Sequence, residues 1–311
     1  MNKQDKIFVA GHRGLVGSAI VRNLQQKGYT NIITRTHSQL DLLNQEKVRE
    51  FFETEKPDIV VLAAAKVGGI HANETYPAEF AYENMQIQCN VIKFAHDAKV
   101  KKLLFLGSTC IYPKLATQPI KEDSLLTGLL EPTNEGYAIA KISGLLMCRY
   151  YKKEYGDDFI SCMPTNLYGP NDNYDLNNSH VLPALIRKFH EAKVSASPTV
   201  ELWGTGAVLR EFLHVDDMAD ACVFLLENYS GEEHVNIGTG LEITIKQLAE
   251  TVGRIIGYEG RIVWNHNMPD GTPRKLTDVT KLHSLGWTHK IELEDGIRMT
   301  YQDYLKEQTQ N

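Results

Sequence analysis

Ile7-Phe8-Val9-Ala10-Gly11-His12-Arg13-Gly14-Leu15-Val16-Gly17 is the stretch that decides the fold. Its apolar start predicts a buried strand, its glycines predict a turn, and the amphipathic residues 18–27 predict a helix. Glycines at this spacing let the backbone approach a pyrophosphate closely, and the free amides at a helix start attract an anion. A glycine motif alone is weak, but this one lies between a strand and a helix. We therefore predict that residues 11–17 bind a dinucleotide.

The residue after the second predicted strand, residues 31–34, indicates which dinucleotide binds. Sites specific for NAD usually place Asp or Glu here to hold the ribose 2′-hydroxyl, whereas this chain has Arg35. Guanidinium groups from Arg13 and Arg35 suit a 2′-phosphate by charge and geometry. The sequence therefore favours NADP(H) over NAD(H), with Asp41 expected near the adenine.

Short apolar runs alternate with helical patterns through the first half of the chain, which predicts a parallel sheet with right-handed crossovers. Ligands of such sheets bind beyond the carboxyl ends of the strands. We predict a Rossmann-type doubly wound α/β domain over residues 1–170 and a smaller C-terminal α/β substrate lobe over 171–311, with segments such as 210–240 returning to the first domain. The further predicted strands are 59–62, 103–106, 159–163 and 235–238, and the further predicted helices are 45–55, 78–99, 137–155, 181–192 and 245–256.

Composition narrows the class of protein. A net charge of −6 and the lack of a long basic run argue against a nucleic-acid partner. No apolar stretch is long enough to cross a membrane, and the polar start lacks the apolar core of a signal peptide. Five cysteines without Cys-x-x-Cys spacing make a disulfide framework or a metal site improbable, so we expect a cytoplasmic enzyme without a metal.

Tyr137-Ala-Ile-Ala-Lys141 places a phenol and an ammonium group on one face of a predicted helix. A nearby positive charge stabilises a phenolate, so Lys141 is expected to lower the pKa of Tyr137 toward neutrality. Ser108 follows the predicted strand 103–106 and is placed to bond the carbonyl oxygen that Tyr137 protonates. The set predicts reduction of a carbonyl group.

The glycine turn, Ser108, Tyr137 and Lys141, in this chain order, resemble the extended branch of the short-chain dehydrogenase/reductase superfamily. The resemblance implies that Tyr137 is the acid or base, that Lys141 also holds the nicotinamide ribose, and that Ser108 orients the carbonyl. Relatives in that branch commonly form homodimers through the two long helices, here residues 78–99 and 137–155.

Longer strings resemble the GDP-L-fucose synthase family. The most particular are Cys110-Ile-Tyr-Pro-Lys114 and Asn178-Ser-His-Val181, and the others are Ala63-Ala-Ala-Lys-Val-Gly-Gly-Ile70, Pro132-Thr-Asn-Glu135, Met163-Pro-Thr-Asn-Leu-Tyr-Gly-Pro170, Arg210-Glu-Phe-Leu-His-Val-Asp-Asp217 and Pro269-Asp-Gly-Thr-Pro-Arg-Lys275. The resemblance implies NADPH-dependent 3,5-epimerisation and 4-reduction of GDP-4-keto-6-deoxy-D-mannose. Cys110 and His180 would move the protons at C3 and C5, although by residue type alone Cys110 is a small buried residue and His180 a loop or capping residue.

The same resemblance implies the binding residues. Besides residues 11–17, Arg35 and Asp41, the cofactor would contact Leu106, Gly107, Lys141, Pro164, Thr165, Asn166, Leu167 and His180. The GDP-sugar would contact Lys188, Trp203, Arg210, Asp270 and Arg274. By residue type alone, Trp203 can equally pack and Arg210 can equally pair with a carboxylate. His214, Asp216 and Asp217 are interpreted as structural because the string precedes a helix.

Other activities stay open at this stage. One is a different NAD(P)-dependent sugar-nucleotide enzyme, such as a 4-epimerase or a 4,6-dehydratase; the dehydratase is disfavoured because Ser108 is followed by Thr109-Cys110 and not by Asp-Glu. Another is a cofactor-sensing protein without activity, which would tend to lose Tyr137 or Lys141. His37 departs from the family, whose members often carry Arg at that position, so discrimination for the 2′-phosphate is expected to be softer.

Overall fold

The central feature of the protein is a six-stranded parallel sheet. The computed structural model describes residues 1–176, 179–268 and 270–310. The sheet has the strand order β10-β5-β4-β3-β1-β2, and every neighbouring pair is parallel. Its strands are β1 (Ile7–Ala10), β2 (Ile32–Ile33), β3 (Ile59–Leu62), β4 (Lys102–Leu106), β5 (Phe159–Pro164) and β10 (Val235–Ile237). The predicted doubly wound α/β class is confirmed.

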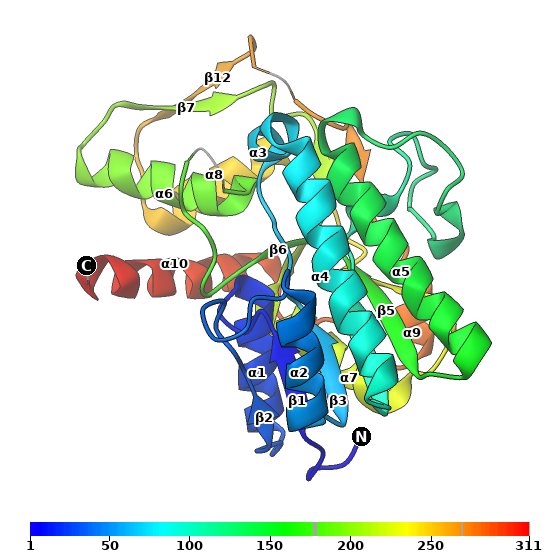
Figure 1. Cartoon of the computed structure of the whole chain (residues 1–311). Helices are drawn as coiled ribbons and strands as arrows, with labels where there is room; N and C mark the ends of the chain where they lie inside the picture. The colour runs from blue at the N-terminus through cyan, green and yellow to red at the C-terminus, as the bar shows by residue number, and fades with distance from the viewer. Residues whose placement is uncertain (177–178, 269, 311) are drawn as a thin grey trace.

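Helices cover both faces of this sheet (Figure 1). α2 (Gln45–Glu55), α4 (Pro77–Asp97) and α5 (Glu135–Tyr155) pack on one face, and α1 (Leu15–Gln26) and α7 (Val215–Asn228) pack on the other. The strands are buried throughout β1, β3, β4 and β5, as expected for parallel strands between two helical layers. The apolar runs therefore form two cores, one on each face.

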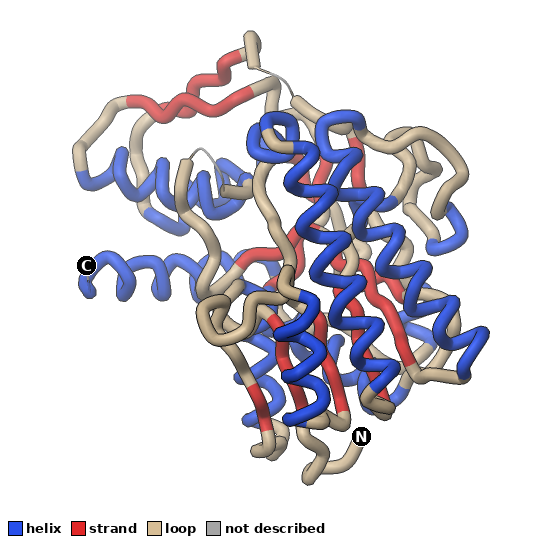
Figure 2. The backbone as a smooth tube through the Cα atoms, in the orientation of Figure 1, coloured by secondary structure: helices blue, strands red, loops and turns tan. Residues whose placement is uncertain are grey.

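The C-terminal lobe has a third core, which lies beside the sheet domain (Figure 2). It packs α6 (Val181–Val194), α8 (Ile245–Ile256) and α10 (Leu293–Gln310) beneath the parallel pair β7 (Thr199–Trp203) and β12 (Arg261–Asn265). Two small sheets connect the parts. One holds β8 (Leu209–Arg210), β11 (Ile243–Thr244) and β13 (Arg274–Lys275), and the other holds β6 (Asn166–Tyr168) and β9 (Phe212–His214). The short helices are α3 (Ile70–Thr75) and α9 (Thr280–Ser284).

The predicted elements agree closely with the structure. The bounds of α2 and α8 match the prediction, whereas β2 is shorter than predicted because only Ile32 and Ile33 pair with β1. β10 returns to pair with β5, and α7 packs along α1. The division into domains at residue 170 stays a prediction. Asn178 and Pro269, which belong to two of the quoted strings, lie outside the described residues, and among those residues no helix is long and apolar enough to cross a membrane.

Candidate active site

The glycine turn joins the carboxyl end of β1 to α1. Gly11 has φ +87°, and a Cβ atom on Gly17 would lie 2.1 Å from the Gly11 carbonyl oxygen, so the protein's own packing requires glycine at both positions. Gly14 differs, since a Cβ atom there would meet nothing closer than 3.6 Å. Gly14 is also the N-cap residue of α1, and it has no side chain that could accept hydrogen bonds from the first amides of the helix. The helix start therefore presents free N–H groups, which fit a pyrophosphate.

The two arginines predicted to bind a 2′-phosphate have different surroundings. Arg13 is exposed within the glycine turn. Arg35 forms an ion pair with Glu55, donates to the Thr34 carbonyl oxygen at 2.9 Å, and lies 5.6 Å from the centre of the Phe51 ring. Asp41 accepts a hydrogen bond from the Leu43 amide at 3.0 Å and thereby supports the turn before α2. Arg35 is thus held at the end of β2 by protein contacts.

Tyr137 and Lys141 lie one turn apart on α5, but their electrostatics differ from the expectation. Burial raises the pKa of Tyr137 above its usual value, the nearby Cys110 adds to this, and a hydrogen bond from Ser108 opposes it. The Lys141 ammonium lies 5.7 Å from the centre of the Tyr137 ring and donates to the Leu106 carbonyl oxygen at 2.8 Å. Burial lowers the pKa of Lys141 to about 8. Desolvation therefore outweighs the predicted lowering of the phenol pKa.

Ser108 and Cys110 lie just beyond the carboxyl end of β4. The Ser108 hydroxyl accepts a hydrogen bond from the Cys110 amide at 3.2 Å. Lys275, from β13, donates to the Cys110 sulfur at 3.5 Å. Burial raises the pKa of Cys110, but the Lys275 charge and hydrogen bonds with Ser108, Lys275 and Asn134 together bring it below its ordinary value. The thiol is thus activated by a cation from a distant part of the chain.

His180 immediately precedes α6 and makes no side-chain capping bond to that helix. Desolvation lowers its pKa, and the positive charge of Lys275 lowers it further. Lys275 therefore acts on both predicted proton-transfer groups. A neutral imidazole and an activated thiol are together suited to moving protons near neutral pH.

The segment that follows β5 is held rigidly. Thr165 donates its amide hydrogen to the Ile237 carbonyl oxygen at 2.9 Å, and the Asn166 side-chain amide donates to the Glu211 carbonyl oxygen at 2.8 Å. β6, which contains Asn166 and Leu167, pairs with β9. Residues 164–167 are thereby fixed at the carboxyl edge of the sheet, where the nicotinamide was predicted.

Two of the predicted GDP contacts lie together on the C-terminal lobe. The Lys188 ammonium lies 5.7 Å from the centre of the Trp203 ring, and Trp203 is 57% exposed. Lys188 also donates to the Glu201 carbonyl oxygen at 3.1 Å, and burial lowers its pKa. An exposed indole beside a cation can bind a base or sugar and a phosphate group.

The other predicted GDP contacts differ in how far they are engaged by protein. Burial lowers the pKa of Arg210, whose hydrogen bond goes to the Leu209 carbonyl oxygen at 2.8 Å. Arg274 is bound by both carboxylate oxygens of Glu242, at 2.8 and 2.7 Å. Asp270 accepts bonds from the amide and the hydroxyl of Thr205, at 2.7 and 2.8 Å, so its carboxylate supports the turn after β7.

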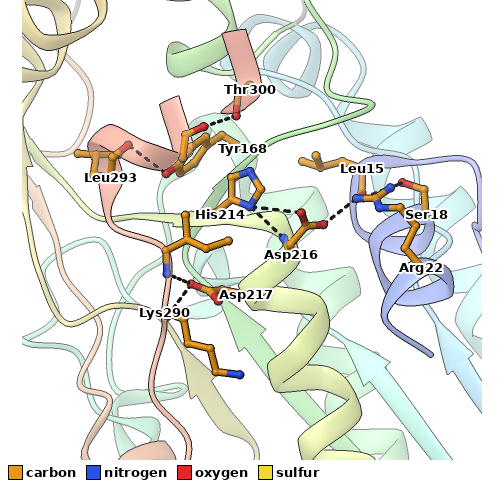
Figure 3. A network of polar contacts seen from close by, with 12 residues as sticks. Leu15, Ser18, Arg22, Tyr168, His214, Asp216, Asp217, Lys290, Leu293 and Thr300 are labelled. Atoms are coloured by element: carbon orange, nitrogen blue, oxygen red, sulfur yellow. Dashed lines mark hydrogen bonds and ion pairs between the residues drawn. The ribbon is translucent and has the colours of Figure 1, made fainter. Parts of the chain in front are cut away.

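The His-Val-Asp-Asp string is structural, as interpreted from the sequence. The His214 ring accepts the Asp216 amide hydrogen bond at 3.2 Å at the start of α7 (Figure 3). Asp216 pairs with Arg22 at 2.8 Å, which connects α7 to α1. Asp217 accepts the amide hydrogens of Lys290 and Ile291 at 2.9 and 2.8 Å and so holds the segment before α10.

Sequence reasoning missed two members of the site. Lys275 ends one quoted string and Asn134 lies within another, but neither received a role. Both contribute to the low pKa of Cys110. The two family strings that contain Lys275 and Asn134 could have indicated that these residues belong to the site. Their contact with Cys110, in contrast, depends on chain segments that are far apart in sequence.

Comparisons with known proteins agree with this arrangement. Residues 7–238 match the model of the NAD dependent epimerase/dehydratase family. The chain is 64% identical over 305 residues to GDP-L-fucose synthase 1 of Arabidopsis thaliana, covering 98% of this chain and 94% of the relative. It is 55% identical over 317 residues to the GDP-L-fucose synthase of Escherichia coli strain K12, covering 99% and 98%.

A solved structure extends the agreement to the whole fold. The GDP-L-fucose synthetase of Naegleria fowleri, determined bound to NADP, matches with a TM-score of 0.92 and 27% identity, covering 99% of this chain and 96% of that one. The predicted resemblance is therefore confirmed. The chain belongs to the NAD dependent epimerase/dehydratase family and, within it, to the group of GDP-L-fucose synthases.

Proposed function

We propose that this enzyme converts GDP-4-keto-6-deoxy-D-mannose to GDP-L-fucose by epimerisation at C3 and C5 and reduction at C4. The observation that carries the proposal is the contact of the Lys275 ammonium with the Cys110 sulfur at 3.5 Å, next to Ser108 and within the electrostatic reach of Tyr137. A reductase without epimerase activity needs Ser108, Tyr137 and Lys141 but has no use for an activated thiol. The relatives named as GDP-L-fucose synthases support the choice of substrate.

The epimerisation steps use the acidity that the 4-keto group gives to the hydrogens on C3 and C5. One of Cys110 and His180 removes a proton from one face, which leaves an enolate with its negative charge on O4, and the other returns a proton to the opposite face. The order of the carbons and the role of each residue at each carbon are left open. Ser108 and Tyr137 hydrogen-bond O4, where negative charge develops. Each inversion consumes no net proton.

Reduction ends the sequence because it removes the ketone. NADPH, when bound, supplies the hydride for C4. Tyr137 gives its proton to the resulting O4 oxyanion, and Lys141, fixed by the Leu106 carbonyl oxygen, supports the phenolate that remains. Because burial lowers the pKa of Lys141 to about 8, its ammonium form gives up a proton more readily than an ordinary lysine does, so it can also return a proton toward Tyr137.

The cofactor and substrate contacts are proposed from the same placement. The open start of α1 at Gly14 fits the pyrophosphate, Arg13 and Arg35 fit the 2′-phosphate, and residues 164–167 fit the nicotinamide side. Lys188, Trp203 and Arg210 fit the GDP group. Asp270 supports the turn after β7 through Thr205, and Arg274 pairs with Glu242, so either residue would contact GDP in addition to these protein partners, as Arg35 would contact the 2′-phosphate in addition to Glu55.

The test is incubation of the purified protein with GDP-4-keto-6-deoxymannose and NADPH in deuterated water. We expect NADPH to be consumed and GDP-fucose to be formed, with deuterium at C3 and C5 of the product. The variant Cys110→Ser should lose the deuterium exchange while binding NADPH normally. Reduction without exchange in the wild-type enzyme would show a simple 4-reductase and refute the proposal.

A 4-epimerase acting on another nucleotide sugar is the second candidate. It would keep its cofactor bound through the cycle, so cofactor absorbance in the purified protein would favour it. The NADP-bound relative and the activated Cys110 favour the epimerase/reductase.

A homodimer and a cytoplasmic location are further parts of the proposal. Helices α4 and α5 pack side by side (Figure 1). They expose Tyr82 (64%) and Tyr150 (57%), which suit burial against a second copy. Light scattering of wild type and Tyr150→Glu would test this, since a dimer through these helices should dissociate. All five cysteines are free thiols, as expected in a reducing compartment.

A further inference from the structure

A buried polar network lies between the segments that carry Cys110 and Lys275. Tyr112, two residues after Cys110, is 3% exposed and donates its hydroxyl hydrogen to the Asn236 side-chain oxygen at 2.5 Å. Asn236 is fully buried in β10. Its side-chain nitrogen donates to the carbonyl oxygens of Ile120 at 3.0 Å and Asp278 at 3.3 Å. One amide side chain therefore contacts both segments.

The direction of each hydrogen bond follows from the neighbours. The two carbonyl acceptors fix the nitrogen of the Asn236 amide, so its oxygen must accept from Tyr112. The Tyr112 oxygen then accepts from Nε2 of His234 at 2.9 Å. Burial lowers the pKa of His234 to about 3, so the ring is neutral and holds its proton on Nε2. The bonds among Tyr112, Asn236 and His234 thus have one consistent arrangement.

The loop after Tyr112 and the segment after Lys275 are also joined directly. Ile120 forms a parallel bridge with Thr277, with hydrogen bonds of 2.8 Å from the Ile120 amide to Leu276 and from the Asp278 amide to Ile120. The buried Glu211 carboxylate accepts from the amide and the hydroxyl of Thr277, at 3.0 and 2.6 Å. Lys275 itself pairs with Arg210 in β8, and the residues directly after it are held by contacts that reach the Cys110 segment.

We infer that Tyr112 and Asn236 are positioning residues that hold the Cys110 thiol and the Lys275 ammonium at hydrogen-bond distance. The inference deepens the proposed function, since it concerns how the epimerising thiol is activated. Four groups act on Cys110: Lys275 from β13, Ser108 after β4, Asn134 just before α5, and Tyr137 on α5. His180 lies within reach of the Lys275 charge. Among these, Lys275 is the cation, and the segment that follows it is bonded to the network at Thr277 and Asp278.

The experiment measures the pH dependence of Cys110 alkylation by iodoacetamide, followed by mass spectrometry of the peptide. Tyr112→Phe removes one hydroxyl and should raise the midpoint by at least about 0.5 pH unit, because the thiolate loses contact with the cation. In the double variant Tyr112→Phe with Lys275→Met, the Tyr112 change should add no further shift to that of Lys275→Met alone. Deuterium exchange at C3 and C5 should fall in Tyr112→Phe, while the Kd of NADPH stays unchanged.

Tyr29→Phe is the matched control. Tyr29 is 1% exposed and donates its hydroxyl to Glu227 at 2.5 Å, so this variant loses a similar buried bond away from Cys110. It should leave the Cys110 midpoint unchanged. A lower Tm in Tyr112→Phe with an unchanged midpoint would mean a purely structural role and overturn the inference. Because alkylation needs no substrate, this result is independent of whether the proposed reaction occurs.

Discussion

Removing the Lys275 charge tests the central electrostatic contact of the site. Lys275→Met keeps much of the side chain's length and apolar stem but deletes the ammonium that lies 3.5 Å from the Cys110 sulfur. This ammonium favours the thiolate, so it lowers the thiol pKa, and its loss must raise that pKa. A hydrogen bond to a charged group contributes about 1.5–3 kcal/mol. At about 1.4 kcal/mol per unit, the pKa of Cys110 should rise by about 1–2 units.

The assay is again the pH profile of Cys110 alkylation. Cys89 provides an internal control, because it is exposed on α4 and its pKa is shifted only by partial burial. Its profile should be the same in both proteins. Lys275→Arg keeps the charge and should retain most of the effect. A Cys110 midpoint that stays within about 0.3 unit of wild type in Lys275→Met would refute the assigned activation.

Lys275→Met should also change the reaction. Exchange of deuterium at C3 and C5 should slow at neutral pH and recover partly as the pH rises and more thiolate forms. The pKa of His180 should rise too, since the Lys275 charge disfavours its protonated form. Exchange that is slow at every pH despite normal folding would instead show that Lys275 contacts the substrate.

Three other predictions concern folding and cofactor choice. Gly17→Ala should lower the Tm by several degrees because its Cβ atom would lie 2.1 Å from the Gly11 carbonyl oxygen. Gly14→Ala should fold normally but weaken NADPH binding. Equal Tm values for the Gly17→Ala and Gly14→Ala variants would contradict the packing argument. Asp220 is bound by Lys27 and Lys290, so its pKa is depressed and its contribution to stability is present above its usual pKa of about 4 and lost as pH falls. The Tm deficit of Asp220→Asn should therefore be largest at neutral pH and shrink below about pH 4, and a deficit independent of pH would exclude this role. Arg35→Ala should raise KM for NADPH more than for NADH. The control Arg49→Ala, which removes exposed ion pairs on α2, should change neither KM. Equal effects of Arg35→Ala on the two KM values would show that Arg35 does not bind the 2′-phosphate.

Local patterns in the sequence predicted the architecture well. The apolar run of β1, the glycine turn and the amphipathic α1 are contiguous, so their periodicity and spacing determine a strand, a turn and a helix. Tyr137 and Lys141 share a helix face because helix geometry dictates it. The same local information identified His214 as a helix cap.

Charges and distant contacts needed the tertiary structure. The pKa of Tyr137 depends on burial, which spacing along α5 does not reveal, so the predicted lowering was wrong. The ion pair of Arg274 with Glu242 likewise became visible only in the tertiary structure, and the predicted contact of Arg274 with GDP stays a prediction.

By itself, the sequence determined the Rossmann-type fold and the family and supplied most candidates for the site, because these follow from local periodicity and from strings read along the chain. Only the tertiary structure decided that Lys275 activates Cys110, since 165 positions separate the two residues and β4 and β13 bring them together. It also decided that the buried side-chain amide of Asn236 bonds both to Tyr112, near Cys110, and to Asp278, near Lys275. The physical reason is that a hydrogen bond or a Coulomb interaction depends on distance in space and on burial, and neither is encoded in the spacing of residues along the chain.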